Sequence, residues 1–544
     1  MADPDDHGPN LSRDFRVGFF GDEATEWAIS EVAFSERLTI FVGAGVSIDQ
    51  NVPPWSELVR QGLALLVRDL IATGAPKWSV LRGLESEFAT AVLNNSFQLP
   101  VATMIDQICL DLEAGDERKA RARRDNLIRS IIYVDPVTGR DRDFAHPPSL
   151  AREVLLLAAV LKSLDSENDL HIVSTNFDDV LRETVKNDPD LKRRLRQLGV
   201  KFRVFGKTPP AGHSPDTVPI VHIHGFIPRR GPSVDPIFSE SDYVAWTHQG
   251  PFRDYVASRF DQGATLILGS SLRDHNIINY VRRTRYKDRR TSRIALLPAE
   301  GDGAFASVPE LGLPAMENLR DGRGKQLGIS VLTPDFFGQV YQFVHEVRHS
   351  AAVEMSGGDP DPYLDRLALW WRAFSPKYLS DECRREVTIG LQNLAMEIQA
   401  EHVFDSDHLK AEIWVRPEMD RSSAPRVLEL WCNSQSVWLS GSAYWPHRVR
   451  IEQRATHPAV RAFAQRGPVF ARDNERSDDR WTHTLATPVI LDAAPYHEIP
   501  VGVMVLRMHA PDHKLSRVTP NTIANLVEID SLVSERGRGF LSPA

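Results

Sequence analysis

The sequence predicts an α/β protein with a mostly parallel sheet covered by helices on both faces, a helical insertion, and a second, C-terminal α+β domain. Three observations predict this architecture. Short β-branched runs alternate with helical segments over the first 350 residues, and a long stretch of helical spacing interrupts them. A run of turn residues then precedes a region with a different order of elements.

Length and composition limit the class of protein. The chain has 544 residues, 25% of them charged and 42% hydrophobic, which is typical of a soluble globular protein with roughly two to four domains. Its 64 basic and 73 acidic residues give a formal net charge of −9, which argues against general nucleic-acid binding. The acidic N-terminus is unlike a signal peptide, and the apolar run 154–161 is too short to span a membrane. We therefore expect a cytoplasmic protein that contacts neither nucleic acid nor membrane.

Six short apolar runs are predicted to be the strands of the sheet. Each is rich in β-branched residues, and helical segments such as 252–260 lie between them. The runs are 38–42, 170–175, 218–223, 264–268, 294–297 and 329–332. Between the first two runs, residues 56–166 show helical apolar spacing in several places. This stretch is interpreted as an inserted helical module.

The second domain follows a linker at 351–362, which contains the turn-forming run Ser-Gly-Gly-Asp-Pro-Asp-Pro. We assign 1–24 to a disordered or extended segment, 25–350 to the first domain and 363–544 to the second. The elements predicted for the second domain are helices at 365–372 and 381–400, strands at 410–415 and 427–432, a helix at 458–465, strands at 485–491 and 502–508, and a helix at 521–535.

The cysteines indicate a reducing compartment. Cys109, Cys383 and Cys432 lie far apart in the sequence and form no Cys-x-x-Cys pair. A disulfide framework and a four-thiolate zinc site are therefore not expected, and the sequence predicts no metal.

A glycine loop follows the first predicted strand. Residues 43–47 read Gly-Ala-Gly-Val-Ser. Glycines allow backbone N–H groups to approach a phosphate, and the N-terminus of the helix that follows such a loop supplies positive potential. The loop is shorter than the dinucleotide fingerprint and lacks the lysine of a P-loop, so a simple strand-to-helix turn explains it equally well.

Polar residues follow three further strands. The segments are 174–178 (Ser-Thr-Asn-Phe-Asp), 222–225 (His-Ile-His-Gly) and 269–274 (Gly-Ser-Ser-Leu-Arg-Asp). Open parallel sheets bind ligands beyond the carboxyl ends of their strands. Four such ends in one chain favour a single ligand crevice over independent turns.

Taken together and in this order, the four motifs resemble those of the sirtuin-like family of NAD-consuming domains, over about residues 37–348. The first motif is similar to the family's Gly-Ala-Gly-x-Ser loop, and 176–178 is similar to its Asn-x-Asp signature. His224 with Gly225 matches the catalytic His-Gly, and 269–271 matches the segment that receives the adenosine half. The resemblance implies a Rossmann-like sheet that binds NAD+ through Gly43, Ala44, Gly45, Ser47, Thr175, Asp178, Gly269, Ser270, Ser271 and Asp274.

The chain also departs from the protein-deacylase branch of that family. Thr175 stands where deacylases have glutamine, and the cysteines needed for their zinc module are lacking. Together with the helical insert, these differences make the chain more similar to bacterial sirtuin-like effectors that hydrolyse NAD during phage defence.

The chemistry of nicotinamide release suggests roles for individual residues. Cleavage creates an oxocarbenium-like ribose, so the site must fix the dinucleotide and admit one nucleophile. Asn176 can orient a ribose hydroxyl or a water, and His224 can take a proton from either. Asp178 is favoured as a structural anchor over a direct catalytic role. His222 is favoured as a core histidine, and Asp274 can either accept from the adenosine ribose or cap a helix.

The second domain resembles GAF-type sensor domains in its order of elements. Tryptophans can line a ligand pocket there, although a core or interface role is favoured; they are Trp414, Trp431, Trp438, Trp445 and Trp481. The basic cluster 282–290 is interpreted as a solvated face or an oligomer contact, because no aromatic residues suited to nucleic-acid binding are interleaved with it.

The sequence therefore predicts an NAD+ glycohydrolase that releases nicotinamide and ADP-ribose. The expected protein is a homo-oligomeric antiphage effector, triggered by a small molecule or protein at its C-terminal domain. A regulator that binds NAD or an ADP-ribose derivative without turnover is the alternative, and NAD-dependent protein deacylation is a less favoured one.

Overall fold

The computed structural model divides the chain into two compact units. The N-terminal unit comprises residues 28–334 and 340–360, and the C-terminal unit comprises residues 1–27, 335–339 and 361–544. The structure describes residues 19–73, 79–95, 98–135, 139–142, 144, 149–212, 214–249, 252–270, 278, 281, 291–298, 322, 324, 326–358, 360–401, 409–417, 427–434, 448–451, 456–472, 483–508 and 520–543. Most of the segment 1–24 therefore lies outside the described residues.

The N-terminal unit is built on a seven-stranded sheet in which every pair of neighbours is parallel. The strands are β1 (Arg37–Val42), β2 (Asp169–Ser174), β3 (Lys201–Phe205), β4 (Thr217–His222), β5 (Ala264–Leu268), β6 (Ser292–Leu296) and β7 (Ser330–Leu332). All six predicted strands are confirmed to within two residues at either end. Their long apolar runs fit a sheet that is buried on both faces.

The strand order places a topological switch point beside β1. The order across the sheet is β3-β4-β2-β1-β5-β6-β7, so the chain extends from β1 first toward β2 and later toward β5. Val42 pairs with Ser174 on one side and with Leu268 on the other. The loops that follow β1, β2 and β5 therefore start at the same edge, where open α/β sheets bind ligands.

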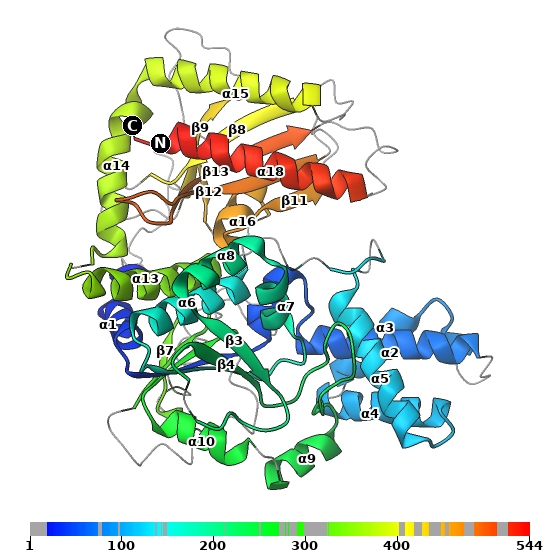
Figure 1. The fold of residues 1–544 in the computed structure, drawn as a ribbon. Coiled ribbons are helices and arrows are strands. Elements are labelled where there is room, and N and C mark those ends of the chain that lie inside the picture. The colour runs from blue at the N-terminus through cyan, green and yellow to red at the C-terminus, as the bar shows by residue number, and fades with distance from the viewer. Residues whose placement is uncertain are drawn as a thin grey trace, which may run out of the picture. The chain divides into compact units, whose positions relative to one another are not determined.

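Helices cover the two faces of this sheet. Figure 1 shows α6 (Leu150–Leu164), α8 (Pro189–Leu198) and α13 (Gly338–Met355) on one side, and α10 (Arg253–Asp261) on the other. On the α10 side, Val256 and Phe260 pack into a buried cluster with Phe41 of β1 and with residues of β2, β4 and β5. This packing holds the strands in the register that aligns their carboxyl ends.

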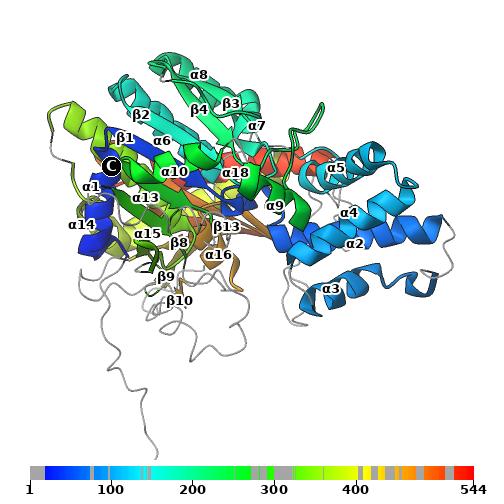
Figure 2. The ribbon, with the colours of Figure 1, turned by 90° about the horizontal axis from the view of Figure 1, so that it is seen from below.

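The helical insertion is smaller than predicted. A module of four helices extends to one side of the sheet in Figure 2: α2 (Trp55–Ala72), α3 (Glu85–Asn95), α4 (Gln98–Leu112) and α5 (Glu117–Tyr133). The prediction extended the insertion to residue 166, but α6 packs on β2 and β4 and belongs to the cover of the sheet. α6 belongs to the sheet because its residues are apolar and buried almost all around the helix, as in a helix covered on every side by protein.

One strand of the N-terminal sheet was not predicted. β3 lies at the edge of the sheet, and its sequence Lys-Phe-Arg-Val-Phe mixes charged and apolar residues. Its residues are exposed or half-buried. Such an edge strand lacks the continuous apolar run on which the other assignments rested.

The C-terminal unit contains a six-stranded sheet with the order β10-β9-β8-β13-β12-β11. Its strands are β8 (Leu409–Val415), β9 (Val427–Asn433), β10 (Arg448–Arg450), β11 (Val469–Arg472), β12 (His483–Leu491) and β13 (Ile499–Met508). Every pair of neighbours is antiparallel. The predicted pairs of strands around a helix are confirmed, and β10 and β11 are additional.

Among the described residues, four helices accompany this second sheet: α14 (Tyr363–Leu379), α15 (Asp381–Glu401), α16 (Pro458–Gln465) and α18 (Pro520–Leu541). Trp414 and Trp431 are fully buried, as the favoured core role requires. The other three tryptophans considered for a pocket lie outside the described residues.

The predicted linker begins inside a helix. α13 continues to Met355 and ends where Gly357 adopts a positive φ of 75°. The N–H of Gly358 then donates to the carbonyl of Val353 at 3.1 Å, in the manner of a glycine C-cap. Within the described residues, no helix has the length and apolarity required to cross a lipid bilayer.

Candidate active site

The loops after β1 and β5 pack directly against each other. The N–H of Gly43 donates to the carbonyl of Leu268 at 2.9 Å, and the N–H of Gly45 donates to that of Gly269 at 2.8 Å. A Cβ added to Gly45 would lie 2.6 Å from the Cα of Gly269. These glycines therefore permit close backbone packing, and the two N–H groups expected to face a phosphate bond to protein carbonyls instead.

No α-helix directly follows this loop. Residues 44–46 and 48–50 form two short 3-10 turns, and α2 begins only at Trp55. Asn51 adopts a left-handed conformation with φ of 58°, and Pro53 and Pro54 follow. A proline restricts the preceding residue to extended conformations, so these residues delay the start of the helix. The helical stretch predicted from residue 56 therefore begins as expected, and two 3-10 turns directly follow the glycine loop.

Asn176 connects the segment after β2 to the glycine loop. Its Nδ2 donates to the carbonyl of Gly43 at 3.1 Å and lies 3.3 Å from the hydroxyl of Ser47. The side chain is 6% exposed, and its Oδ1 has no hydrogen-bond partner among the described residues. A buried carbonyl oxygen without a partner is costly, so this atom is suited to accept from a ribose hydroxyl or a water.

Asp178 is also hydrogen-bonded to the glycine loop. Its Oδ1 accepts from the Ser47 hydroxyl at 3.0 Å and from the N–H of Val180 at 3.1 Å. Burial raises the pKa of the Asp178 carboxyl to about 6, although both hydrogen bonds act to lower it. Ser47 and Asp178, both predicted to bind the cofactor, thus bond to each other in this structure.

The two histidines near the end of β4 have different neighbours. β4 ends at His222, and Gly225 then turns the chain with φ of 66°. The His222 ring lies 4.7 Å from that of Phe226, whereas the His224 ring lies 4.9 Å from that of Trp246 on α9 (Glu240–Gln249). Because β4 ends at His222, the alternation of side chains along that strand does not extend to His224.

His222 supports the backbone of Asn176. Its Nδ1 lies 3.3 Å from the Asn176 carbonyl oxygen, so this nitrogen must carry the hydrogen. Burial lowers the pKa of His222 to about 4, which keeps the imidazole neutral near pH 7. The favoured interpretation of His222, a core histidine satisfied by a neighbour, fits this geometry.

His224 lies in an aromatic setting beside the same edge. Its ring makes edge-to-face contacts with Tyr243 and Trp246 of α9, at centroid distances of 5.5 and 4.9 Å. The indole N–H of Trp246 donates to the carbonyl of Ile223 at 2.8 Å. These contacts fix α9 against the chain segment that carries His224, which is itself buried.

The remaining predicted residues divide into two groups. The N–H of Thr175 donates to the carbonyl of Val42 at 3.2 Å, Ala44 begins the first 3-10 turn, and Ser270 lies against Gly43. Ser271, Asp274 and the basic cluster 282–290 lie outside the described residues.

Comparison with protein-family models locates one match in this unit. Residues 170–310 match the SIR2-like domain. The matched segment contains Asn176, His224 and Gly269, and it supports an NAD-related function in general. No curated protein matches the chain.

Sequence reasoning missed Asp179 beside the SIR2-like Asn-x-Asp segment. This carboxyl is fully buried, pairs with Arg182 and lies 3.9 Å from Nε2 of His222. Burial raises the pKa of Asp179 to about 8. The doubled aspartate in the sequence was the available signal, but its burial depends on tertiary packing.

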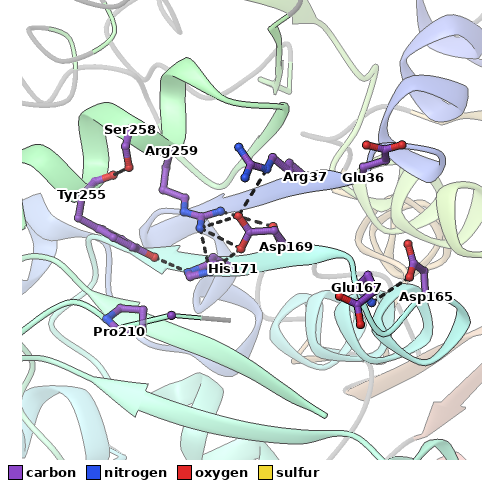
Figure 3. Close-up of a pocket in the computed structure, with 11 residues that line it drawn as sticks. Glu36, Arg37, Asp165, Glu167, Asp169, His171, Pro210, Tyr255, Ser258 and Arg259 are labelled. Carbon is purple, nitrogen blue, oxygen red and sulfur yellow. Dashed lines mark hydrogen bonds and ion pairs between the residues drawn. The ribbon is translucent and has the colours of Figure 1, made fainter. Parts of the chain in front are cut away.

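A separate polar cavity of about 610 Å³ lies at the opposite, amino-terminal edge of the sheet (Figure 3). The Asp169 carboxylate accepts from Arg259 at 2.9 Å and lies 3.0 Å from Nε2 of His171, whose Nδ1 is 2.6 Å from the Tyr255 hydroxyl. These charged and polar groups satisfy one another. None of the predicted site residues that the structure describes lines this cavity.

The close packing of the two loops can be tested with Gly269→Ala. Gly269 has φ of 64°, and an added Cβ would lie 2.6 Å from the N of Val46. Gly199 is a matched control, because its φ is 68° but no atom lies within 4 Å of an added Cβ. We expect Gly269→Ala to lower the free energy of unfolding by about 2–4 kcal/mol and Gly199→Ala by about 1 kcal/mol. Equal losses in chemical denaturation would contradict the packing described.

The buried carboxyl of Asp178 predicts a dependence of stability on pH. Its folded pKa of about 6 exceeds the ordinary value of 3.8, so the folded state binds more protons between these values and stability falls as pH rises through them. Asp178→Asn should reduce the loss of unfolding free energy between pH 4.5 and 7 by on the order of 2 kcal/mol. The measurement is urea denaturation at both pH values, with the fully exposed Asp254→Asn as control. Identical profiles for wild type and Asp178→Asn would show that this carboxyl is not the source.

Proposed function

We propose that the N-terminal unit hydrolyses NAD+ to nicotinamide and ADP-ribose. The observation that carries this proposal is the buried Oδ1 of Asn176, an acceptor without a partner among the described residues, at the switch point of the sheet. The neighbouring strand supplies His224 at the same edge, and the surrounding segment matches the SIR2-like domain. A ribose hydroxyl or a water is the kind of donor that this oxygen requires.

The reaction breaks the bond between nicotinamide and the ribose carbon, transfers the hydroxyl of water to that carbon and releases one proton. Asn176 is already oriented by its donations to Gly43 and Ser47, so its free oxygen is fixed without substrate. His224 accepts the proton from the water or from a ribose hydroxyl. Asp178 keeps the glycine loop in place through its hydrogen bond with Ser47.

The residues at this edge fit a dinucleotide in their chemistry. Hydroxyl and amide groups from Thr175, Asn176 and Ser270 lie at the ends of neighbouring strands, where they can accept from and donate to ribose hydroxyls. The glycines of the β1 loop and Gly269 allow these strand ends to approach without intervening side chains.

The wider role proposed for the protein is antiphage defence through depletion of NAD. The C-terminal unit is a separate α+β unit, which fits a GAF-like sensor for a small molecule or protein that triggers the enzyme. We propose that the protein acts as a homo-oligomer in the cytoplasm. This part of the proposal rests on the motif resemblance described from the sequence.

Substitution of the two proposed catalytic residues tests the activity. Asn176→Ala and His224→Ala are each expected to lower nicotinamide release at least about 100-fold, because general-base and orienting groups contribute on that scale. The measurement is chromatographic quantification of nicotinamide and ADP-ribose from purified full-length protein, and of cellular NAD after expression.

Asn168→Ala is the matched control for Asn176→Ala. Asn168 is also 6% exposed, its Nδ2 donates to a backbone carbonyl at 3.1 Å, and its Oδ1 likewise has no partner among the described residues. It precedes β2, at the other edge of the sheet. Full turnover in Asn176→Ala, or equal losses in both asparagine variants, would refute the assignment. NAD binding without product in every activating condition would favour the receptor function.

A further inference from the structure

One tyrosine hydroxyl joins the two chain segments that carry the proposed catalytic residues. Tyr133 is the last residue of α5 and is 1% exposed. Its hydroxyl accepts from the N–H of Asp179 at 2.8 Å and donates to the carbonyl of Ile227 at 2.7 Å. Asp179 is three residues from Asn176, and Ile227 is three residues from His224.

The hydroxyl completes a small ring of hydrogen bonds. The N–H of Ile227 also donates to the carbonyl of Phe177 at 2.7 Å, so the segments after β2 and β4 are bonded directly as well. A tyrosine hydroxyl can donate one hydrogen bond and accept others at the same time, which this arrangement requires. Burial raises the pKa of Tyr133 well above its ordinary value of 10, so the proton needed for the bond to Ile227 stays in place.

The same helix holds the chain beyond His224 at two further points. Arg129 donates to the carbonyls of Pro228 and Gly231, both at 2.9 Å. Arg124 is buried and lies 3.5 Å from the carboxylate of Asp242, which in turn accepts from the N–H of Phe238 just before α9. α5 therefore contacts the segment from 227 to 242 at successive turns, whereas its contact with the segment after β2 runs through Tyr133.

We propose that Tyr133 is a positioning residue that sets the spacing between Asn176 and His224, and that the helical module of residues 55–133 acts on catalysis through it. The proposal rests on the proposed NAD hydrolysis for its kinetic consequence, but its geometric content is independent of that activity. Loss of the hydroxyl leaves the N–H of Asp179 and the carbonyl of Ile227 without this partner, so both segments relax together. The reacting groups then lose their mutual orientation while the residues that contact the dinucleotide remain.

The test compares Tyr133→Phe with Tyr255→Phe in the full-length protein. Both changes remove one tyrosine hydroxyl that is hydrogen-bonded in the N-terminal unit, but Tyr255 lines the cavity at the amino-terminal edge, where its hydroxyl bonds to His171. Hydrogen exchange is measured in peptides covering 176–182 and 224–230. Tyr133→Phe is expected to speed exchange about tenfold in both peptides, and Tyr255→Phe in neither. Unchanged exchange in Tyr133→Phe overturns the proposal, whatever the activity.

Kinetics supply the second readout. Tyr133→Phe should lower kcat for NAD+ roughly 10- to 100-fold, with KM changed less than about threefold, because small misplacements of reacting groups cost rate more than binding. A rise in KM at constant kcat would contradict positioning and assign Tyr133 to substrate binding. If wild-type protein releases no nicotinamide in any activating condition, the proposed function fails, while the exchange experiment still decides the geometry.

Arg129→Ala keeps the proposal testable if Tyr133→Phe does not fold. Arg129 bonds to carbonyls beyond His224, and none of the hydrogen bonds given above joins it to the segment after β2. In Arg129→Ala we expect faster hydrogen exchange in the peptide 224–230 but not in 176–182. The loss of kcat should be smaller than the loss expected for Tyr133→Phe, which loosens both segments. Faster exchange in both peptides would show that the link does not depend on the tyrosine hydroxyl.

Discussion

Parallel pairing of β1 with β2 and β5 is the constraint on which the candidate site depends. Because Val42 is level with Ser174 and Leu268, the three loops that follow begin at one edge of the sheet. Residues more than a hundred positions apart in the sequence, such as Gly43 and Asn176, then come within hydrogen-bond distance. A shift of one residue in either pairing would move the loops apart, and each side chain of the shifted strand would then point to the opposite face of the sheet.

The glycines of the β1 loop act differently from the phosphate cradle that their sequence suggests. The N–H groups of Gly43 and Gly45 donate to the carbonyls of Leu268, the last residue of β5, and Gly269, and the absence of a Cβ lets the two loops lie in contact. The groups that can hydrogen-bond to a ligand are therefore side chains at the strand ends, above all the amide of Asn176. Ser47 and Asp178 stabilise this arrangement by bonding to each other.

Much of the sheet could be predicted from the sequence, because buried parallel strands such as 264–268 are continuous apolar runs with abrupt ends. The polar residues after β2 and β4 could be found because their position follows from the ends of those runs. β3 was not predicted because it is an exposed edge strand, which needs no continuous apolar run. The start of α2 could be predicted because Pro53 and Pro54 disfavour a helical conformation of the residues that precede them.

The partners of the site residues could not be predicted, because they depend on packing between distant elements. Nothing in the pattern of α5 marks Tyr133 as different from other apolar residues of that helix, yet the fold places its hydroxyl between two loops. The burial of Asp179, which raises its pKa to about 8, likewise depends on the fold, which places Tyr133 of α5 and His222 of β4 beside it.

A crystal structure of full-length His224→Ala protein with NAD+ bound would show where the dinucleotide lies, because the variant should bind NAD+ without consuming it. We expect a ribose hydroxyl or an ordered water within hydrogen-bond distance of Asn176 Oδ1, next to the loops that contain Gly43 and Gly269. A dinucleotide seated instead in the cavity formed by Asp169, His171 and Tyr255 would contradict this expectation.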